Sequence, residues 1–401
     1  MRILLSEGSG LTSRQTATLL GERGHEVEVL SSSRVCLAGF TDHVRRVHPV
    51  PLFGDHPVAW FDAAIAIARA RCVDLLFPTQ EQVAVLAALA ARVPVPTIVP
   101  PFPALRRVQD KLAAIRTLAE LGLPQPRSLA ATRDDDLRGF DAFPAFVKRP
   151  IGTASNGVRR VRSAAELREA ARALGIAERG VVIQAEAEGP LAMVQAVADR
   201  GRLVAWHATV RVLEGASGGA AVKQSAPLPA IAADLARLVA GLAWHGAIAL
   251  DAILSDTGPL YIDVNPRLVE PYNAQLAGVD LVGAMLALGA GAHPPEQPPS
   301  RAGVRSHQLL LAILGAAQRG AGRAAIAGEL LRAAAGIQPY EASREELTPI
   351  AHDARGAIPT ALAAAATLAW PGAWRWFVGA ARAYALTPTG WDEIVTMADA
   401  G

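Results

Sequence analysis

The chain has 401 residues, of which 51% are hydrophobic, and its formal net charge is only +2. A single hydrophobic core rarely serves so long a chain, so two or three domains are expected. The near-neutral charge argues against nucleic acid or an anionic membrane as a partner. Cys36 and Cys72 lack metal-ligand spacing, which is typical of reduced thiols in a cytoplasmic protein. The chain begins directly with an apolar strand, so no signal peptide is expected.

Residues 1–104 alternate short apolar runs with helical patterns, which predicts an open α/β layer with a parallel sheet. Strands are predicted at 3–5, 26–30, 73–77 and 97–99, and helices at 12–23, 58–71 and 81–92. Ligands of such sheets lie outside the carboxyl ends of the strands, so segments 6–10 and 78–81 are expected to line a crevice. Glu81 is a candidate for holding a substrate amine, although a carboxylate at a helix N-terminus is favourable without any ligand.

Residues 105–187 carry features that suit phosphate binding. A helix is predicted over 111–121, and Lys111 opens it. A short strand ends at Lys148 and runs into the small, hydroxyl-rich segment 151–157, which can bring backbone N–H groups close to phosphate oxygens. A further strand leaves through an acidic segment at 186–188, which is a candidate hinge for adenine and ribose.

Residues 188–292 contain a predicted hairpin with an unusual set of oxygen donors. Strand alternation places Asp251, Asp263 and Asn265 on one face, and the turn lies at 255–258. Oxygen ligands without His or Cys suit Mg²⁺, and the guanidinium of Arg267 suits phosphate. The combination indicates enzyme chemistry on a nucleoside triphosphate; a surface hairpin with solvated acids is the alternative.

The order of these segments resembles the ATP-grasp superfamily over residues 1–290. Asp-Lys111 comes first, then Lys148 before a glycine loop, then the acidic hinge, then Asp251 and the run Asp-Val-Asn-Pro-Arg267. The likeness is to the carboxylate–amine ligase group, which shares the fold of carbamoyl-phosphate synthase. Neither a Walker loop nor a kinase catalytic loop is present in the sequence.

The resemblance implies a role for each matching position. Lys111 and Lys148 would contact the phosphates of ATP, and Asp251, Asp263 and Asn265 would bind two Mg²⁺ ions. The loop over the triphosphate and the adenine–ribose hinge would comprise Gly152, Ser155, Asn156, Gly157, Gln184, Glu186, Ala187 and Glu188. The family usually has an acid at the position of Ala185, so adenine recognition is expected to use the hinge backbone or Glu186.

The resemblance also implies a reaction. A substrate carboxylate attacks the γ-phosphate of ATP, and an amine then attacks the acyl phosphate to give an amide, ADP and phosphate. Lys148 and Arg267 would act on the phosphoryl group. Arg211 is the candidate for the substrate carboxylate, with Lys223 as a helper; a solvated surface charge is the alternative for each. Two other functions stay open: a thiol, hydroxyl or bicarbonate in place of the amine, or a non-catalytic nucleotide-binding module.

The C-terminal region follows a proline-rich connector at 292–300 and is predicted to be helical. Helices are expected at 307–317, 324–335, 360–370 and 373–384. Pro371-Gly372 interrupts the apolar stretch, so no transmembrane helix is expected. A helical hairpin on the core or a homodimer contact is favoured, and membrane contact is the weaker alternative. That contact would use Trp370, Trp374, Trp376 and Phe377.

These patterns together predict an α/β protein of the ATP-grasp class. Two α+β subdomains would clasp ATP behind an open parallel N-terminal domain. The expected domains are 1–104, the N-terminal α/β domain; 105–187, the small lid-like subdomain; 188–292, the large subdomain with the Mg²⁺ site; and 301–401, the helical C-terminal region.

Overall fold

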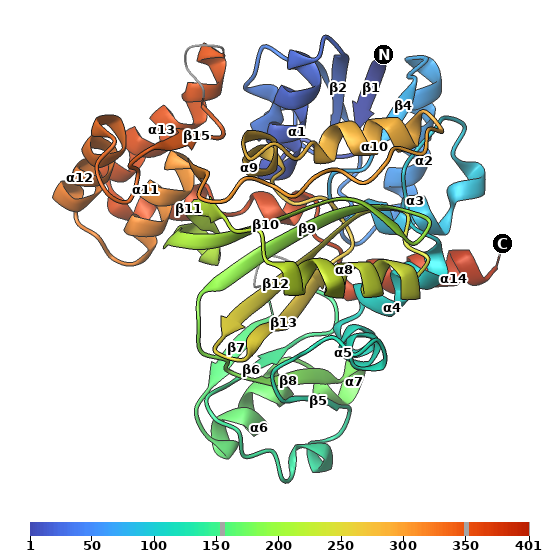
Figure 1. The fold of residues 1–401 in the computed structure, drawn as a ribbon, viewed down its shortest axis with the longest axis vertical. Coiled ribbons are helices and arrows are strands. Elements are labelled where there is room, and N and C mark those ends of the chain that lie inside the picture. The colour runs from blue at the N-terminus through green and yellow to red at the C-terminus, as the bar shows by residue number, and fades with distance from the viewer. Residues whose placement is uncertain (153–156, 349–352, 401) are drawn as a thin grey trace.

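The computed structural model describes residues 1–152, 157–348 and 353–400. Figure 1 shows three β-sheet layers and a lateral group of C-terminal helices. The parallel N-terminal sheet lies at one end, the smallest sheet lies at the other, and the longest sheet runs between them. The candidate site lies along this central sheet, and residues of the N-terminal layer and of the C-terminal region also line it.

The N-terminal layer is a parallel sheet with the strand order β3-β2-β1-β4, as the sequence predicts. Its strands and helices are β1 (Arg2–Leu5), α1 (Leu11–Glu22), β2 (Glu26–Ser31), β3 (Val44–Pro49), α2 (Pro57–Ala70), β4 (Leu75–Phe77) and α3 (Val83–Ala88). The predicted strand at 97–99 is reduced to a bridge between Leu76 and Thr97. Strand β3 escaped prediction because it is an edge strand whose Arg45 and Arg46 are exposed, which removes the apolar alternation.

Two helices, α4 (Phe102–Gln109) and α5 (Lys111–Glu120), lead into the small sheet. The carboxylate of Asp110 caps α5 by accepting from the backbone N–H of Leu112 at 2.7 Å, which places Lys111 at the first helical position. The small sheet is antiparallel and has its own apolar core. Its elements are β5 (Ser128–Ala131), β6 (Ala145–Lys148), β7 (Val158–Val161), α6 (Ala164–Ala173), α7 (Ile176–Arg179) and β8 (Val181–Ala185).

The central sheet has the strand order β13-β12-β9-β10-β11-β14-β15. Alternate residues of β9 face opposite cores: Val194 and Ala196 pack in the cluster with α8, and Val197 packs in the cluster with α10. The two helices thus cover opposite faces of the sheet (Figure 1). The elements are β9 (Leu191–Asp199), β10 (Arg202–Glu214), β11 (Ala220–Ser225), α8 (Pro229–Gly241), β12 (Gly246–Ser255), β13 (Gly258–Asn265), α9 (Tyr272–Leu276) and α10 (Leu281–Gly289).

The C-terminal region differs from the purely helical unit that the sequence predicts for 301–401. Strands β14 (Arg305–His307) and β15 (Ser343–Glu345) extend the central sheet, because β14 pairs with β11. The predicted helix at 373–384 is replaced by short 3₁₀ turns at Pro371–Trp376 and Ala380–Ala383, since Pro371, Gly372 and Gly379 interrupt the helical pattern. The α-helices of the region are α11 (Leu309–Gln318), α12 (Arg323–Ala335), α13 (Ala357–Ala369) and α14 (Pro388–Asp399).

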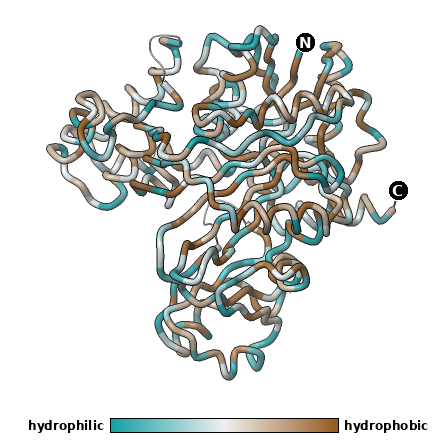
Figure 2. The backbone as a smooth tube through the Cα atoms, viewed as in Figure 1, coloured by the Kyte–Doolittle hydropathy of each residue, from teal (hydrophilic) through white to brown (hydrophobic). Residues whose placement is uncertain are grey.

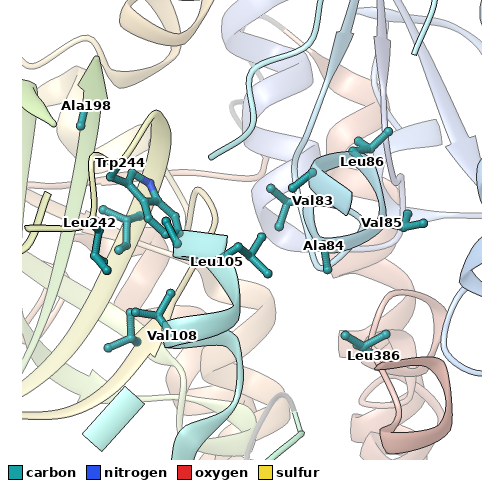
Figure 3. Close-up of a cluster of buried hydrophobic side chains, with 14 of the residues drawn as sticks. Val83, Ala84, Val85, Leu86, Leu105, Val108, Ala198, Leu242, Trp244 and Leu386 are labelled. Carbon is teal, nitrogen blue, oxygen red and sulfur yellow. The ribbon is translucent and has the colours of Figure 1, made fainter. Parts of the chain in front are cut away.

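One hydrophobic core joins the N-terminal layer to the central sheet. Leu105 and Val108 of α4 lie between Trp244 on one side and Leu86 of α3 on the other (Figure 3). Leu386, just before α14, belongs to the same buried cluster. Helix α14 itself packs on α2 and α3, so the end of the described chain returns to the N-terminal domain. The relative position of the two sheets is therefore fixed by shared apolar packing.

Apolar and polar segments alternate over short distances along the chain (Figure 2). Within the described residues, no helix is both long and apolar enough to cross a membrane. Trp370 and Trp376 remain more than half exposed and pack against each other with ring centroids 5.4 Å apart.

A buried ion pair anchors the C-terminal region to the N-terminal domain. The guanidinium of Arg14 lies 2.9 Å from the carboxylate of Asp353, and both side chains are almost fully buried. The same carboxylate accepts hydrogen bonds from the hydroxyl of Thr41 and the backbone N–H of Asp42. A buried charge without its partner costs far more than an exposed one.

We therefore expect Asp353→Ala to lower the free energy of unfolding by roughly 3–5 kcal/mol, because it leaves Arg14 buried and uncompensated. The matched control is Asp399→Ala, which removes an exposed pair with Arg106 and should cost less than about 1 kcal/mol. Urea unfolding followed by circular dichroism measures both. Equal, small losses in the two variants would show that the buried pair does not anchor the region.

Candidate functional site

The predicted hairpin forms as expected and places its two carboxylates face to face. Asp251 on β12 is the direct cross-strand partner of Asp263 on β13, and Asn265 pairs with Ala249 two residues further along. All three oxygen-bearing side chains line one cavity of about 740 Å³, together with Arg267. Cross-strand partners lie closer than any other residues of a sheet, so the two acids share one small volume.

The pKa values of the two acids are shifted in opposite directions. Burial, and then the charge of Asp263, raise the pKa of Asp251 to about 7. Burial also opposes ionisation of Asp263, but Lys111 and Lys148 outweigh it and lower the pKa of that carboxyl. The ammonium of Lys111 lies 2.9 Å from Asp263. Asp251 therefore lacks a full counter-charge, which is the condition of a carboxylate that binds a cation.

The donor set fits Mg²⁺ bound jointly with a phosphate. Nowhere in residues 1–152, 157–348 and 353–400 do three or more His, Cys, Asp or Glu side chains gather into a possible metal site. Two carboxylates and the amide oxygen of Asn265 therefore leave coordination positions to be filled from outside the protein. Mg²⁺ usually binds in this way, through one or two carboxylates and substrate phosphate oxygens.

Lys148 is held at the end of β6 by two hydrogen bonds. Its ammonium donates to the side-chain oxygen of Gln184 and to the backbone carbonyl of Ile262, both at 2.8 Å. Burial, and the charge of Lys111, lower its pKa to about 8. Gln184 also donates to the hydroxyl of Ser128 at 3.1 Å, so its amide is oriented to position Lys148.

Arg267 is fixed by Glu81, which corrects the expectation that Glu81 faces a substrate amine. The carboxylate of Glu81 is 4% exposed and accepts from the Nε of Arg267 at 3.1 Å and from the amide of Gln109 at 3.0 Å. The remaining contacts of the guanidinium, to Leu268 and Asn265, are long at 3.5 and 3.4 Å. Its two terminal nitrogens thus retain donor capacity toward the cavity.

Arg211 and Lys223 are cross-strand partners on β10 and β11 but have different surroundings. Arg211 donates to the carbonyl of Gly218 at 2.8 Å and pairs with Glu214 at 3.1 Å, and the structure does not place it on the cavity wall. Lys223 is buried at the cavity floor and pairs with Glu270 at 2.6 Å and Glu346 at 3.0 Å. Two glutamates pair with Lys223, so it is neither an unpaired cation available to a substrate carboxylate nor a solvated surface charge.

The predicted adenine–ribose hinge and the predicted triphosphate loop differ in how many of their residues make contacts within the protein. Glu186 forms an ion pair with Arg160 at 2.6 Å, and Glu188 is exposed beyond Ala187. Gly157 has a φ of +82° and its carbonyl accepts from the backbone N–H of Arg149, which closes the base of the loop that begins at Gly152. Ser155 and Asn156 lie outside the described residues.

Several cavity residues have no signal in the sequence. Glu270 comes from the segment after the hairpin, Ser9 and Gly10 come from the loop after β1, and Phe377 and Tyr384 come from the C-terminal region. The loop after β1 was expected at a crevice wall, and that expectation is confirmed for Ser9 and Gly10. The other three carry no motif. The folding of the C-terminal region over the sheet brings Phe377 and Tyr384 to the cavity, and Glu270 reaches it from the segment just after β13.

Comparison with known proteins agrees with this geometry. Residues 108–271 match the family described as the ATP-grasp domain. The match spans less than half of the chain and assigns an ATP-grasp domain to this region. The matched region contains Lys111, Lys148, Asp251, Asp263 and Arg267, and the α/β architecture is that of the superfamily.

The chain is 31% identical over 198 residues to N5-carboxyaminoimidazole ribonucleotide synthase of Mycobacterium leprae (strain TN). That match spans 44% of this chain and 44% of the relative, which is less than half of either protein.

Solved structures share the fold over about three quarters of the chain. The biotin carboxylase domain of 2-oxoglutarate carboxylase from Hydrogenobacter thermophilus, solved with MgADP, ADP and bicarbonate, has a TM-score of 0.62 at 13% identity and covers 76% of this chain and 73% of its own. N5-carboxyaminoimidazole ribonucleotide synthetase from Thermus thermophilus has a TM-score of 0.59 at 22% identity, covering 76% and 81%. The L-amino acid ligase from Bacillus licheniformis has 0.58 at 20% identity, covering 74% and 75%.

Gly189 lies between β8 of the small sheet and β9 of the central sheet. A substitution at this position tests whether the hinge must approach the hairpin closely. Its φ is +134°, and a Cβ placed there would lie 2.1 Å from the carbonyl oxygen of Leu254. We expect Gly189→Ala to displace the hinge and raise KM for ATP about tenfold or more, as small displacements of positioning elements do. The measurement is steady-state ADP formation at varied ATP concentration.

Gly258, in the hairpin turn facing this hinge, supplies the control. It has a φ of +123°, and nothing lies within 4 Å of its Cβ position. Gly258→Ala therefore introduces backbone strain without the clash. An unchanged KM in Gly189→Ala, or an equal change in both variants, would contradict the close approach as the cause.

Proposed function

We propose that this protein uses MgATP to convert a substrate carboxylate into an acyl phosphate and then couples the acyl group to an amine, with release of ADP and phosphate. The observation that carries this proposal is the facing pair Asp251 and Asp263, with Lys111, Lys148 and Arg267 converging on the same place from three different parts of the fold. Such an arrangement suits the transfer of a phosphoryl group between two anions.

The positively charged side chains reduce the electrostatic repulsion that opposes this phosphoryl transfer. A carboxylate and the γ-phosphate repel each other, so positive groups must lie in place before the two meet. Lys148 is already oriented by Gln184 and Ile262, and Arg267 is already oriented by Glu81. Neither side chain has to reorganise when the nucleotide binds, and the energy of its charge is available to the transition state. Mg²⁺, when bound between the two carboxylates and Asn265, supplies further charge neutralisation and alignment of the phosphates.

Each cation has a distinct position relative to the reaction. Lys111 and Lys148 lie against Asp263 and β6, on the side of the small sheet where the triphosphate is expected. Arg267 lines the cavity, so its terminal nitrogens can hold the phosphoryl oxygens as the bond to the substrate carboxylate forms. The same contacts can stabilise the acyl phosphate until the acceptor attacks.

An amine acceptor is supported by Glu270. Its carboxylate lines the cavity beyond Arg267 and already accepts from Lys223 and from the amide of Gln308. A carboxylate at this point favours a cationic or proton-releasing group, as an attacking amine is.

Bicarbonate as the activated acid is a second candidate. It is favoured by the 31% identity to N5-carboxyaminoimidazole ribonucleotide synthase over 198 residues. In that case the phosphoryl chemistry and the roles of Lys148, Asp263 and Arg267 stay the same, and only the acid differs.

The test incubates the pure protein with MgATP, hydroxylamine and a panel of carboxylates, and measures hydroxamate, ADP and AMP. We expect hydroxamate with ADP. In Asp263→Ala and in Lys148→Ala, ADP formation should fall by about 10²–10³-fold or more, the loss seen when one group that stabilises transition-state charge is removed. Circular dichroism checks that both variants are folded.

Asp256→Ala is the matched control, because Asp256 is an exposed aspartate in the turn of the same hairpin. Its activity should equal that of the unmodified protein. AMP in place of ADP would refute the acyl-phosphate mechanism, and full turnover in Asp263→Ala would refute the assignment of the site.

A further inference from the structure

The cavity that contains the metal hairpin continues into an apolar space, which we call the distal chamber. Its walls come from three separate segments: residues 35–40 after β2, residues 310–314 of α11, and residues 359–384 of α13 and the 3₁₀ turns. The large apolar side chains on these walls are Val35, Leu37, Phe40, Leu310, Leu362 and Phe377.

Charge is distributed unevenly along this continuous cavity. Among the described lining residues, the charged side chains are Asp251, Asp263, Arg267, Lys223 and Glu270. All five belong to β11, β12, β13 or the segment just after β13. The three segments of the distal chamber contribute no charged side chain among the residues that the structure describes. The cavity is therefore polar and charged at one end and apolar at the other.

The walls of the distal chamber lie outside the part of the chain that matches the ATP-grasp domain. That match covers residues 108–271, whereas the chamber is built by residues 35–40, 310–314 and 359–384. The chamber segments also pack on one another, because Leu37 and Phe377 join the buried cluster around Leu314 and Ile313. The chamber is thus a built part of the fold, adjacent to the phosphoryl-transfer end but separate from the nucleotide-binding segments.

We propose that the carboxylate activated by this protein carries an apolar body, such as an aryl or alkyl group, that occupies the distal chamber. This inference rests on the proposed function. The carboxylate end must reach Arg267 and the phosphate next to Asp251 and Asp263, and the apolar walls line the same cavity. A small polar acid would leave these walls exposed to water, whereas an apolar body removes them from it.

The first experiment compares acids of increasing apolar size in the hydroxylamine assay. The panel is bicarbonate, acetate, propionate, hexanoate and 3-phenylpropionate, with alanine, leucine and phenylalanine as amino-acid counterparts. ADP release is measured for every acid, and hydroxamate for every acid except bicarbonate. We expect kcat/KM to rise by about fourfold for each methylene that enters the chamber, the gain given by burial of one CH₂ group.

Two variants test whether the chamber itself causes this preference. Ala381→Phe adds a ring to a chamber wall and should lower kcat/KM for 3-phenylpropionate relative to that for acetate by about tenfold or more. Phe377→Ala enlarges the chamber and should shift the preference toward longer acids. Ala365→Phe is the control, since Ala365 lies on the exposed face of α13 and does not line the cavity.

The outcomes separate this inference from the proposed function. ADP formation with bicarbonate or acetate at least as efficient as with the apolar acids would overturn the inference and leave the acyl-phosphate function intact. A size preference that is the same in Ala381→Phe, Phe377→Ala and Ala365→Phe would also overturn it. If no acid supports ADP formation, the proposed function fails and this inference fails with it.

Discussion

The site depends on one electrostatic constraint: two carboxylates share the same face of a hairpin at a half-buried position. Asp251 and Asp263 are direct partners in the register of β12 and β13, and burial opposes the charge of both. Two lysines, Lys111 of α5 and Lys148 of β6, reach the hairpin and supply positive charge beside these carboxylates. The positive charges of these lysines therefore compensate the carboxylates at the junction of the small sheet and the central sheet. This junction is the candidate binding place for a metal–nucleotide complex.

A second cluster of charged and polar groups connects the C-terminal region to the central sheet and to the N-terminal domain. Glu346 accepts from Lys223 of the central sheet, from Gln15 of the N-terminal domain and from Gln308 at the start of α11. Together with the hydroxyl of Ser306, these make four donors on one buried carboxylate, which fix the position of the chain just after β15. The apolar wall of the cavity is thus placed by a polar network, since apolar packing alone is not directional.

Local sequence patterns were sufficient for most elements and for the charged groups of the nucleotide end. The hairpin turn and the start of α5 at Lys111 follow from residues close to one another in the chain. The roles of Glu81, Lys223 and Arg211 were not accessible in the same way. Glu81 and Arg267 are 186 residues apart, and the partner of a buried charge over such a separation is decided by topology.

The sequence by itself determined the donor set, because strand alternation and the run from Asp263 to Arg267 specify which oxygens and cations share a face. Only the tertiary structure decided how those groups are paired and what lies beyond them. Lys223 became a buried counter-ion, Glu81 a support for Arg267, and the C-terminal segment an apolar wall of the cavity. The physical reason is that periodicity fixes the direction of a side chain within its own element, whereas its partner depends on which elements pack together.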